Sequence, residues 1–272
     1  LSNNILLCGE SAVSNAFPAT GINYFPTNNT TLPATNVYAL SFRATHAPYL
    51  MDTVCWWPLD VDGRDIFGGL NGLLSGNVSF DNTFYTNATY QVHTGMVNQA
   101  FFGDGLATRM IVSRCPQLDL SARKGFSIEG WINPAVITNA FPIVEWSDAS
   151  VTNGGGQGVA FWVSGQRGTN WPGALWANMC DTNSQPHIIT TVTNALTNGG
   201  WQHVAFTYEA ATRSARLYTN GYLAVTKVMA ATNTFVPSMR GDLYLGYHPE
   251  GLTNCVAFYG GLDEFGLYER AL

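Results

Sequence analysis

The sequence predicts an all-β fold, a sandwich of two antiparallel sheets, and three observations support this prediction. From Val54 onward, short segments in which apolar and polar residues alternate recur along the chain. Such alternation places every second side chain on the same face of a strand. Turns rich in glycine and asparagine separate the segments, and no helical periodicity persists between them. Many short strands joined by regular turns are typical of a sandwich or jelly roll.

The alternation is clearest in five segments, which are residues 125–134, 158–165, 215–227, 241–248 and 261–272. Within the first segment, Ile128 faces one side of the strand, and Glu129 and Trp131 face the other. Within the third, Asn220-Gly221 supplies the two positive-φ positions of a type I′ turn. The sequence therefore predicts a tight β-hairpin in the third segment and strands in the other four.

Residues 1–51 differ in composition from the rest, and the sequence predicts a boundary between this arm and a sandwich domain at 52–272. The arm contains only two formal charges, Glu10 and Arg43, and four prolines interrupt it. Its short apolar runs predict two or three short strands without a core of their own. The residues that we expect to dock this arm are Ile5, Leu7, Tyr24, Phe25, Tyr38, Leu40 and Phe42.

Ordering each residue of the arm costs about 1–2 kcal/mol of backbone entropy. Because the arm has no core of its own, it must offset this cost by burying its apolar side chains on another surface. That surface belongs either to its own sandwich or to a neighbouring subunit, through strand addition. A head-to-tail exchange of arms does not close and builds filaments. The first functional hypothesis is therefore an extracellular structural or adhesive protein, a fibril or coat subunit whose partners are copies of itself.

The charge content restricts the partners of the protein. Charged residues make up 11% of the chain and the net charge is −6, with no basic run. Binding to nucleic acid needs a clustered basic surface, so we exclude it. No apolar window is long enough to span a membrane. A neutral surface rich in asparagine, threonine and serine favours a secreted, extracellular or cell-surface protein.

Five cysteines occur, and none has the CxxC spacing of a zinc or redox motif. Wide spacing in a secreted chain favours long-range disulfides. The candidates for these bonds are Cys55, Cys115, Cys180 and Cys255, which leaves Cys8 over or bound to another chain. Buried free thiols are the alternative.

Three Asn-x-Ser/Thr triplets mark candidate N-glycosylation sites at Asn29, Asn77 and Asn87. Such triplets also arise by chance in a chain rich in asparagine and threonine. In either case they predict surface loops.

Six motifs in a fixed order give residues 54–272 a family resemblance. They are VCWWPLD (54–60), GGLNGLLSG (68–76), NQAFFGDG (98–105), GFSIEGWINP (125–134), WQHVAFTY (201–208) followed by RLYTNG (216–221), and GGLDEFGLYERAL (260–272). Together they resemble the bacterial laminin-G-like, concanavalin A-like lectin/glucanase jelly-roll domains. The resemblance implies a secreted bacterial protein with an adhesive, glycan-binding or architectural role, although the fold also hosts glycosidases.

The resemblance also implies one structural calcium ion, held between an Asp-rich loop and the closing strand. The matching carboxylates are Asp104 and Asp263, and Asp60 is a further oxygen donor in the segment LDVDGRD. The sequence departs from the family after Gly105, where Leu106-Ala107-Thr108-Arg109 replaces the expected acidic residues. Aspartates that only form turns are therefore the alternative to a calcium site.

No enzymatic motif is present. A glycosidase of this fold needs two carboxylates about 5–10 Å apart, and the string Glu-x-Asp-x-x-Glu that supplies them is absent. The sequence also lacks a nucleophile elbow, an HExxH helix and a P-loop. The resemblance gives Glu129 and His203 structural roles, so we expect a protein that is not an enzyme.

Glycan binding is the second functional hypothesis. Trp131 and Trp162 fall on the non-core faces of their strands. If those strands are neighbours, the two rings form an aromatic stripe beside Glu129 on which a sugar can stack. The alternative is that protein covers these tryptophans, because large exposed apolar patches usually mark an interface.

Overall fold

The computed structural model describes nine stretches of the chain, which are residues 52–80, 83–86, 89–92, 95–147, 157–165, 171–181, 185–229, 236–249 and 256–272. The chain divides into two units, Leu1–Ala44 and Thr45–Leu272. The sandwich lies in the second unit. The arm at 1–51 and its docking residues from Ile5 to Phe42 lie outside the described residues, so the hypothesis of an assembly arm stays a prediction.

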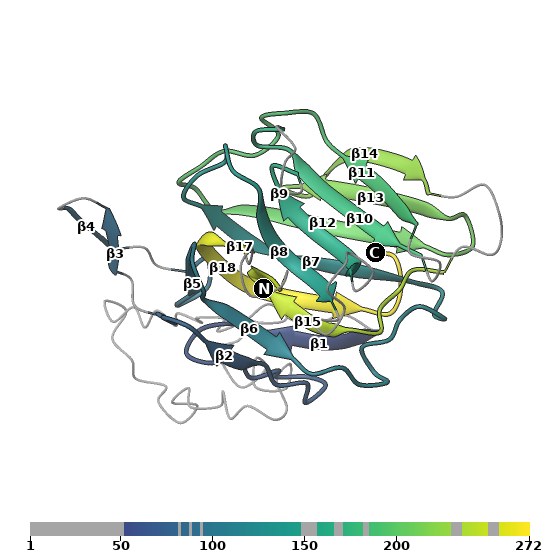
Figure 1. Ribbon diagram of the computed structural model, residues 1–272, viewed down its shortest axis with the longest axis horizontal. Helices are drawn as coiled ribbons and strands as arrows, with labels where there is room; N and C mark the ends of the chain where they lie inside the picture. Colours follow the sequence, from purple (N-terminus) through teal and green to yellow (C-terminus); the bar gives the residue numbers. More distant parts are fainter. Residues whose placement is uncertain are drawn as a thin grey trace, which may run out of the picture. The chain divides into compact units, whose positions relative to one another are not determined.

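The first sheet has seven antiparallel strands (Figure 1). In the order in which they lie side by side, six of them are β1 (Thr53–Trp57), β18 (Tyr259–Tyr268), β7 (Gly125–Pro134), β12 (Gln202–Glu209), β13 (Ser214–Thr219) and β14 (Tyr222–Val228). The seventh strand, β5 (Phe101–Asp104), pairs with one end of β18. The first and last strands of the sandwich in chain order are therefore hydrogen-bonded neighbours.

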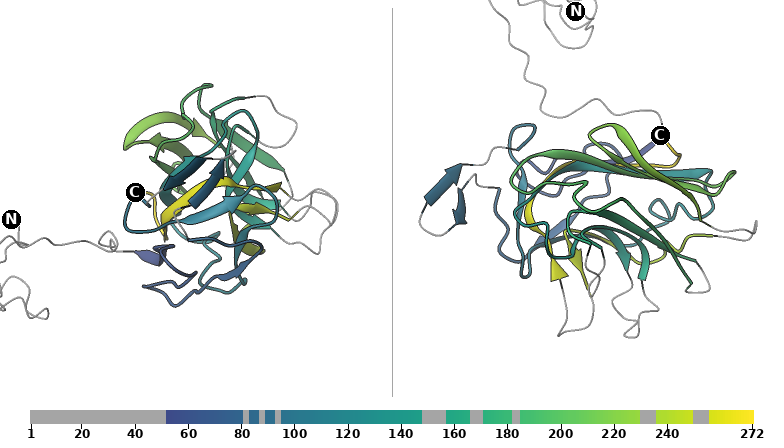
Figure 2. Two further views of the ribbon diagram at one scale, coloured as in Figure 1. Left: turned by 90° about the vertical axis from the view of Figure 1, so that its left-hand side faces the viewer. Right: turned by 90° about the horizontal axis from the view of Figure 1, so that it is seen from above.

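The second sheet also has seven strands, and it faces the first sheet (Figure 2). Its order is β11 (Pro186–Thr190), β10 (Leu175–Cys180), β9 (Gln157–Val163), β8 (Phe141–Ser147), β15 (Asp242–Leu245), β6 (Arg109–Val112) and β2 (Leu73–Ser75). Two small ladders complete the strands, β16 (Tyr247–His248) with β17 (Val256–Ala257), and β3 (Thr83–Thr86) with β4 (Thr89–Val92).

The described residues contain no α-helix, and none of them forms a segment that could cross a membrane as a helix. The all-β sandwich that the alternation predicts is therefore confirmed. The hairpin is confirmed as well, because Asn220 and Gly221 have φ angles of 51° and 80° between β13 and β14. Both residues adopt the left-handed region that a type I′ turn requires.

The core lies between the two sheets and is built from the inward side chains of both. Phe126 and Phe206 come from the first sheet and Phe161 from the second, and all three are fully buried. Phe206 lies 5.4 Å from Phe126 and 5.8 Å from Phe161, measured between ring centroids. Burial of each such side chain contributes about 1.5–3 kcal/mol, and the contact across the layers fixes how the sheets face each other.

Candidate glycan-binding site

On the outer face of the first sheet, three partly exposed side chains and the buried Tyr268 form a cluster. Glu129 and Trp131 lie two residues apart on β7, so they share a face. His203 of β12 is the cross-strand partner of Trp131, and their ring centroids are 5.2 Å apart. Glu129 Oε2 lies 3.3 Å from His203 Nε2, and Glu129 Oε1 accepts a 2.7 Å hydrogen bond from the hydroxyl of Tyr268. We call Glu129, Trp131, His203 and Tyr268 the Trp131 cluster.

Three members of the Trp131 cluster reach solvent, while Tyr268 is buried behind them, and the Glu129 carboxylate remains charged. The side chains of His203 and Glu129 are 24% and 21% exposed, and Trp131 is half-buried. Burial raises the pKa of Glu129, but hydrogen bonds from His203 and Tyr268 and the attraction of His203 outweigh it and lower the pKa below its ordinary value. Burial and the neighbouring Glu129 raise the pKa of Tyr268, which therefore stays a hydrogen-bond donor.

Two contacts behind the cluster hold it in place. The ring of Trp56 packs edge-on against Tyr268, with 6.4 Å between centroids. The Trp56 indole N–H donates a 2.5 Å hydrogen bond to Glu264 Oε2. Because Trp56 and Glu264 are buried, they restrain Tyr268, which in turn fixes the Glu129 carboxylate.

Trp162 is not part of this cluster, so the expected aromatic stripe is wrong. Trp131 lies on β7 of the first sheet, whereas Trp162 lies on β9 of the second. Trp162 is fully buried, its N–H donates a 3.0 Å hydrogen bond to Glu145 Oε2, and its ring packs against Trp176. The alternative in which protein covers this tryptophan therefore holds for Trp162.

Glu145 is a buried acid whose contacts with Trp162 and His248 the sequence did not predict. It is completely buried on β8 and lies 2.8 Å from His248 Nδ1 through its Oε1. His248 also packs against the ring of Trp162. Because solvent does not reach Glu145, it cannot serve as a second carboxylate for a bound sugar.

The three candidate calcium ligands do not meet at one point. Asp104 on β5 pairs with Tyr259 of β18, four residues before Asp263, which corresponds to roughly 13 Å along a strand. Its Oδ1 accepts the backbone amides of Leu106, Ala107 and Thr108 at 2.9, 2.9 and 3.0 Å. Burial raises the pKa of Asp104, but these hydrogen bonds outweigh it and lower the pKa to about 2. Asp104 therefore closes its own turn.

Asp60 and Asp263 do lie near each other, because both bind the loop that precedes β5. Asp60 Oδ1 accepts the amide of Gln99 and Asp263 Oδ2 accepts the amide of Val97, each at 3.0 Å. Asp263 is fully buried, and its Oδ1 has no hydrogen-bond partner among the described residues. Burial is the main cause that raises the pKa of Asp263 to about 8, and the charges of Glu264 and Asp60 add to it. A proton therefore neutralises this carboxyl near neutral pH.

These residues do not fit the calcium ion that the family resemblance implies. Within the described stretches, no three acidic, histidine or cysteine side chains gather as a metal site. Calcium takes six to eight oxygen ligands, and Asp104 is too far from Asp263 to contribute. The expected three-ligand site does not form in the structure.

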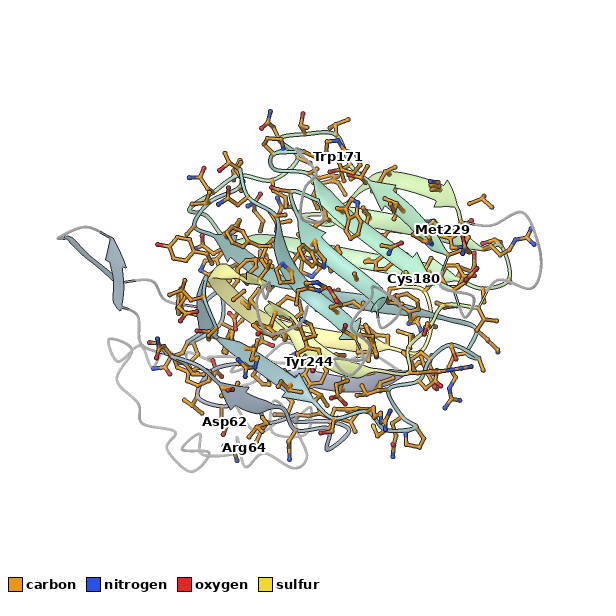
Figure 3. The ribbon with its side chains drawn as sticks, viewed as in Figure 1. Asp62, Arg64, Trp171, Cys180, Met229 and Tyr244 are labelled. Atoms are coloured by element: carbon orange, nitrogen blue, oxygen red, sulfur yellow. The ribbon has the colours of Figure 1, made fainter. Side chains whose placement is uncertain are left out.

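The loop between β1 and β2 holds further aspartates, and a hollow of about 460 Å³ runs along its residues 58–66. Asp65 fixes the loop, and its two oxygens accept the backbone amides of Trp56, Phe67, Gly68 and Leu70. Asp62 pairs with Arg64 at 2.7 Å on the surface. Figure 3 labels Asp62 and Arg64 at this end of the sandwich.

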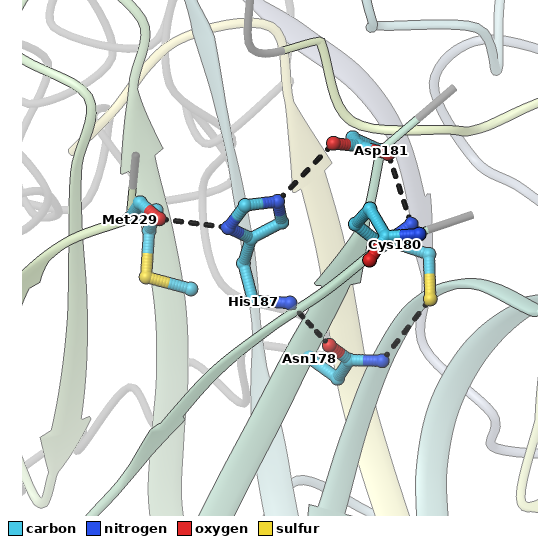
Figure 4. A network of polar contacts seen from close by, with 6 residues as sticks. Asn178, Cys180, Asp181, His187 and Met229 are labelled. Carbon is cyan, nitrogen blue, oxygen red and sulfur yellow. Dashed lines mark hydrogen bonds and ion pairs between the residues drawn. The ribbon is translucent and has the colours of Figure 1, made fainter. Parts of the chain in front are cut away.

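A cysteine, a histidine and an aspartate meet at the end of β10, but they do not form a nucleophilic site (Figure 4). Burial raises the pKa of the Cys180 thiol, which accepts a hydrogen bond from the Asn178 amide. His187 Nδ1 lies 2.8 Å from the carbonyl of Met229, and its Nε2 lies 3.3 Å from Asp181. The Cys180 thiol is therefore protonated. The His187 imidazole is held between Asp181, which follows β10 of the second sheet, and Met229, which follows β14 of the first.

The expected disulfides do not form among the described cysteines. Cys55, Cys115 and Cys180 are free thiols, and Cys55 and Cys180 are buried like small apolar residues. Cys8 and Cys255 lie outside the described residues. Of the glycosylation candidates, Asn77 is exposed and its amide donates to Asp104 at 3.4 Å, whereas Asn29 and Asn87 lie outside the described residues.

Comparisons with known proteins agree with this architecture. A search of curated proteins found no match. Domain 4 of an extracellular arabinanase from Geobacillus stearothermophilus, solved with arabinotriose, has a TM-score of 0.54 at 18% identity, covering 81% of this chain and 94% of that one. The binding domain of botulinum neurotoxin serotype D has a TM-score of 0.54 at 14% identity, over 81% of this chain and 49% of that one.

The type C neurotoxin, whose cell entry is described as dependent on two ganglioside molecules, has a TM-score of 0.53 at 14% identity, over 81% of this chain and 48% of that one. This chain thus spans about half the length of the neurotoxin domains it matches. At these identities the likeness concerns the fold alone. The family model of the concanavalin A-like lectin/glucanases superfamily matches residues 111–272, more than half of the chain. The chain therefore belongs to the concanavalin A-like lectin/glucanase superfamily.

Proposed function

We propose that this protein is a non-catalytic glycan-binding module of a secreted or cell-surface bacterial protein. The observation that carries the proposal is the Trp131 cluster, where an aromatic ring, a charged carboxylate and an imidazole reach solvent together. Structural neighbours of the same fold include a domain solved with arabinotriose and a toxin that depends on gangliosides. Those ligands belong to those proteins, and they support the proposal only as examples of what the fold accommodates.

The chemistry of the cluster suits a sugar. The C–H groups on one face of a pyranose or furanose ring pack against a flat aromatic ring, and Trp131 supplies that ring. The Glu129 carboxylate accepts hydrogen bonds from sugar hydroxyls, because an ionised oxygen forms the stronger, charge-assisted bonds. His203 offers a second polar contact beside the ring. Because Tyr268 and Trp56 restrain these groups, little conformational entropy is lost on binding.

The same geometry supports a binding role rather than hydrolysis. Both glycosidase mechanisms need an acid and a second carboxylate on either side of the scissile bond. Among the described residues, Glu129 contacts His203 and Tyr268, and Glu145 is enclosed on the other sheet. The cluster therefore offers one accessible carboxylate, which is enough to orient a sugar.

The test is an oligosaccharide array followed by calorimetry on the sugars that bind. We expect Trp131→Ala to weaken binding about tenfold or more, since truncating a central aromatic anchor typically costs at least 1–2 kcal/mol. Glu129→Gln should weaken it as well, because the amide retains the shape and loses the charge. Tyr222→Ala is the matched control, since Tyr222 is an aromatic residue of β14 that is 79% exposed. Equal losses in the control and in Trp131→Ala would refute the proposed site.

Self-assembly through residues 1–51 is a second candidate function, supported by the low charge of that segment. The proposal predicts that the full chain forms oligomers or fibres, and that a variant starting at residue 51 stays monomeric. Light scattering and electron microscopy of the two proteins measure this directly. Assembly of the shortened protein to the same extent would rule out the arm as the cause.

A further inference from the structure

An arginine on the outer face of the second sheet has no acidic partner among the described residues. Arg109 begins β6, whose residues Met110 and Val112 point into the core and are buried. Because side chains alternate along a strand, Arg109 and Ile111 point away from the core. The guanidinium of Arg109 donates a 2.9 Å hydrogen bond to the carbonyl of Ala107, and no carboxylate of the described residues pairs with it.

One tyrosine lies next to this guanidinium, and a second tyrosine packs against the first. The Arg109 guanidinium carbon lies 4.8 Å from the centre of the Tyr247 ring, which is a cation–π contact. The Tyr247 ring is in turn tilted by 37° against Tyr244, with 6.1 Å between centroids. Figure 3 labels Tyr244 on β15. We call Arg109, Tyr244 and Tyr247 the Arg109 site.

The setting of this guanidinium favours an anion. The chain contains 18 Asp and Glu against 12 Lys and Arg, and four of the eight described arginines have a carboxylate partner, whereas Arg109 instead stacks on a tyrosine. Arg109 is only half-exposed, and stacking on Tyr247 fixes the plane of its guanidinium. A fixed guanidinium with free N–H groups is suited to two parallel hydrogen bonds with a planar anion.

We propose that the Arg109 site binds a negatively charged sugar, one that carries a carboxylate or a sulfate group. The guanidinium pairs with the anion, the partly exposed Tyr247 contacts the apolar part of the sugar ring, and the buried Tyr244 supports Tyr247 from behind. This inference rests on the proposed glycan-binding function, but it concerns a different site. The Trp131 cluster lies on the first sheet, whereas Arg109 and Tyr244 lie on the second sheet and Tyr247 on the short strand β16, so the two can be tested separately.

The experiment compares each charged sugar with its neutral counterpart. Calorimetry measures the binding to the full chain of oligogalacturonate and its fully methyl-esterified form, and of a sulfated galactan oligosaccharide and the same oligosaccharide without sulfate. We expect one or both charged sugars to bind at least about tenfold more tightly than the neutral counterpart, and this advantage to shrink at high salt. A preference for oligogalacturonate identifies a carboxylate ligand, and a preference for the galactan identifies a sulfate ligand.

Single substitutions test whether Arg109 causes the tighter binding of charged sugars. Arg109→Gln should remove this charge preference and leave the affinity for the neutral sugars unchanged, and Arg109→Lys should keep part of it. Arg216→Gln is the matched control, because Arg216 is a half-buried arginine of β13 that lies 3.9 Å from Glu209. Thermal melting checks that each variant is folded. If a variant does not fold, the comparison of charged and neutral sugars on the unmodified chain still tests the inference.

Each result has a definite meaning. Equal affinity for the charged sugars and their neutral counterparts, or a charge preference that survives Arg109→Gln, overturns the inference while the proposed function stands. If no sugar binds the unmodified chain, both fail. A charge preference that survives Trp131→Ala and disappears in Arg109→Gln supports two separate sites.

Discussion

The buried carboxyl of Asp263 makes the stability of this protein depend on pH in an unusual direction. Its pKa is raised to about 8 in the folded protein, chiefly by burial, whereas an aspartate in an unfolded chain titrates near 3.9. The folded state therefore holds a proton that the unfolded state has lost between these two values. The stability that the protonated form confers is fully present below pH ~3.9 and is lost as the pH rises through about 8.

The perturbation that isolates this effect is Asp263→Asn. Between about pH 4 and 8, one extra bound proton changes the free energy of unfolding by up to about 1.4 kcal/mol per pH unit. From pH 5 to pH 8 the unmodified protein should therefore lose up to roughly 4 kcal/mol relative to the variant. Asparagine has nearly the same shape, keeps an oxygen for the amide of Val97 and does not titrate.

The assay is urea unfolding of both proteins at half-unit steps between pH 5 and 9, in the presence of EDTA. The quantity of interest is the difference between the two free energies of unfolding at each pH, because other groups cancel in it. Asp104→Asn is the control, since the lowered pKa of Asp104, about 2, makes its contribution to stability change only below pH ~4, so its difference from the unmodified protein should stay constant from pH 5 to 9. A difference between Asp263→Asn and the unmodified protein that does not change with pH would refute a protonated Asp263.

Three further outcomes are expected. Asp65→Ala should destabilise the protein by about 3 kcal/mol or more, measured by urea unfolding, because four backbone amides lose their acceptor at once; a loss below 1 kcal/mol would show that water replaces the carboxylate. Adding calcium or EDTA should leave the melting temperature nearly unchanged, because the expected ligands do not converge, and a rise of several degrees with calcium would contradict this. Gly221→Ala should cost about 1 kcal/mol in the free energy of unfolding, since Gly221 has φ of 80°; a neutral effect would mean that the hairpin adapts.

Local patterns in the sequence predicted what depends on neighbouring residues in the chain. Alternation placed Glu129 and Trp131 on one face of a strand, and both reach solvent there. Asn220-Gly221 specified a turn that depends only on its own backbone angles. These features need no knowledge of strand order, which explains why the sequence alone was sufficient.

Local patterns do not specify the order and register of the strands. The incorrect predictions of the aromatic stripe and of the calcium ligands follow from this. Trp162 has the same alternation as Trp131 but lies on the other sheet, because alternation does not specify which strands become neighbours. Asp104 and Asp263 lie on paired strands, but the register separates them by four residues. His203 was assigned a structural role, and its place in the cluster could have been found only from the pairing of β12 with β7.

The position of β18 has a consequence for how this protein is made. β18 is the last strand of the sandwich in chain order, yet it lies inside the first sheet and pairs with β1, β5 and β7. During synthesis β1 and β7 leave the ribosome long before β18, and the edges that pair with β18 stay uncovered until it follows. Pairings of such long sequence separation form slowly, and unpaired edges invite aggregation. The sandwich is thus open to misassembly until β18 is made, and a chain cut short before Tyr259 lacks the strand that joins β1 to β7.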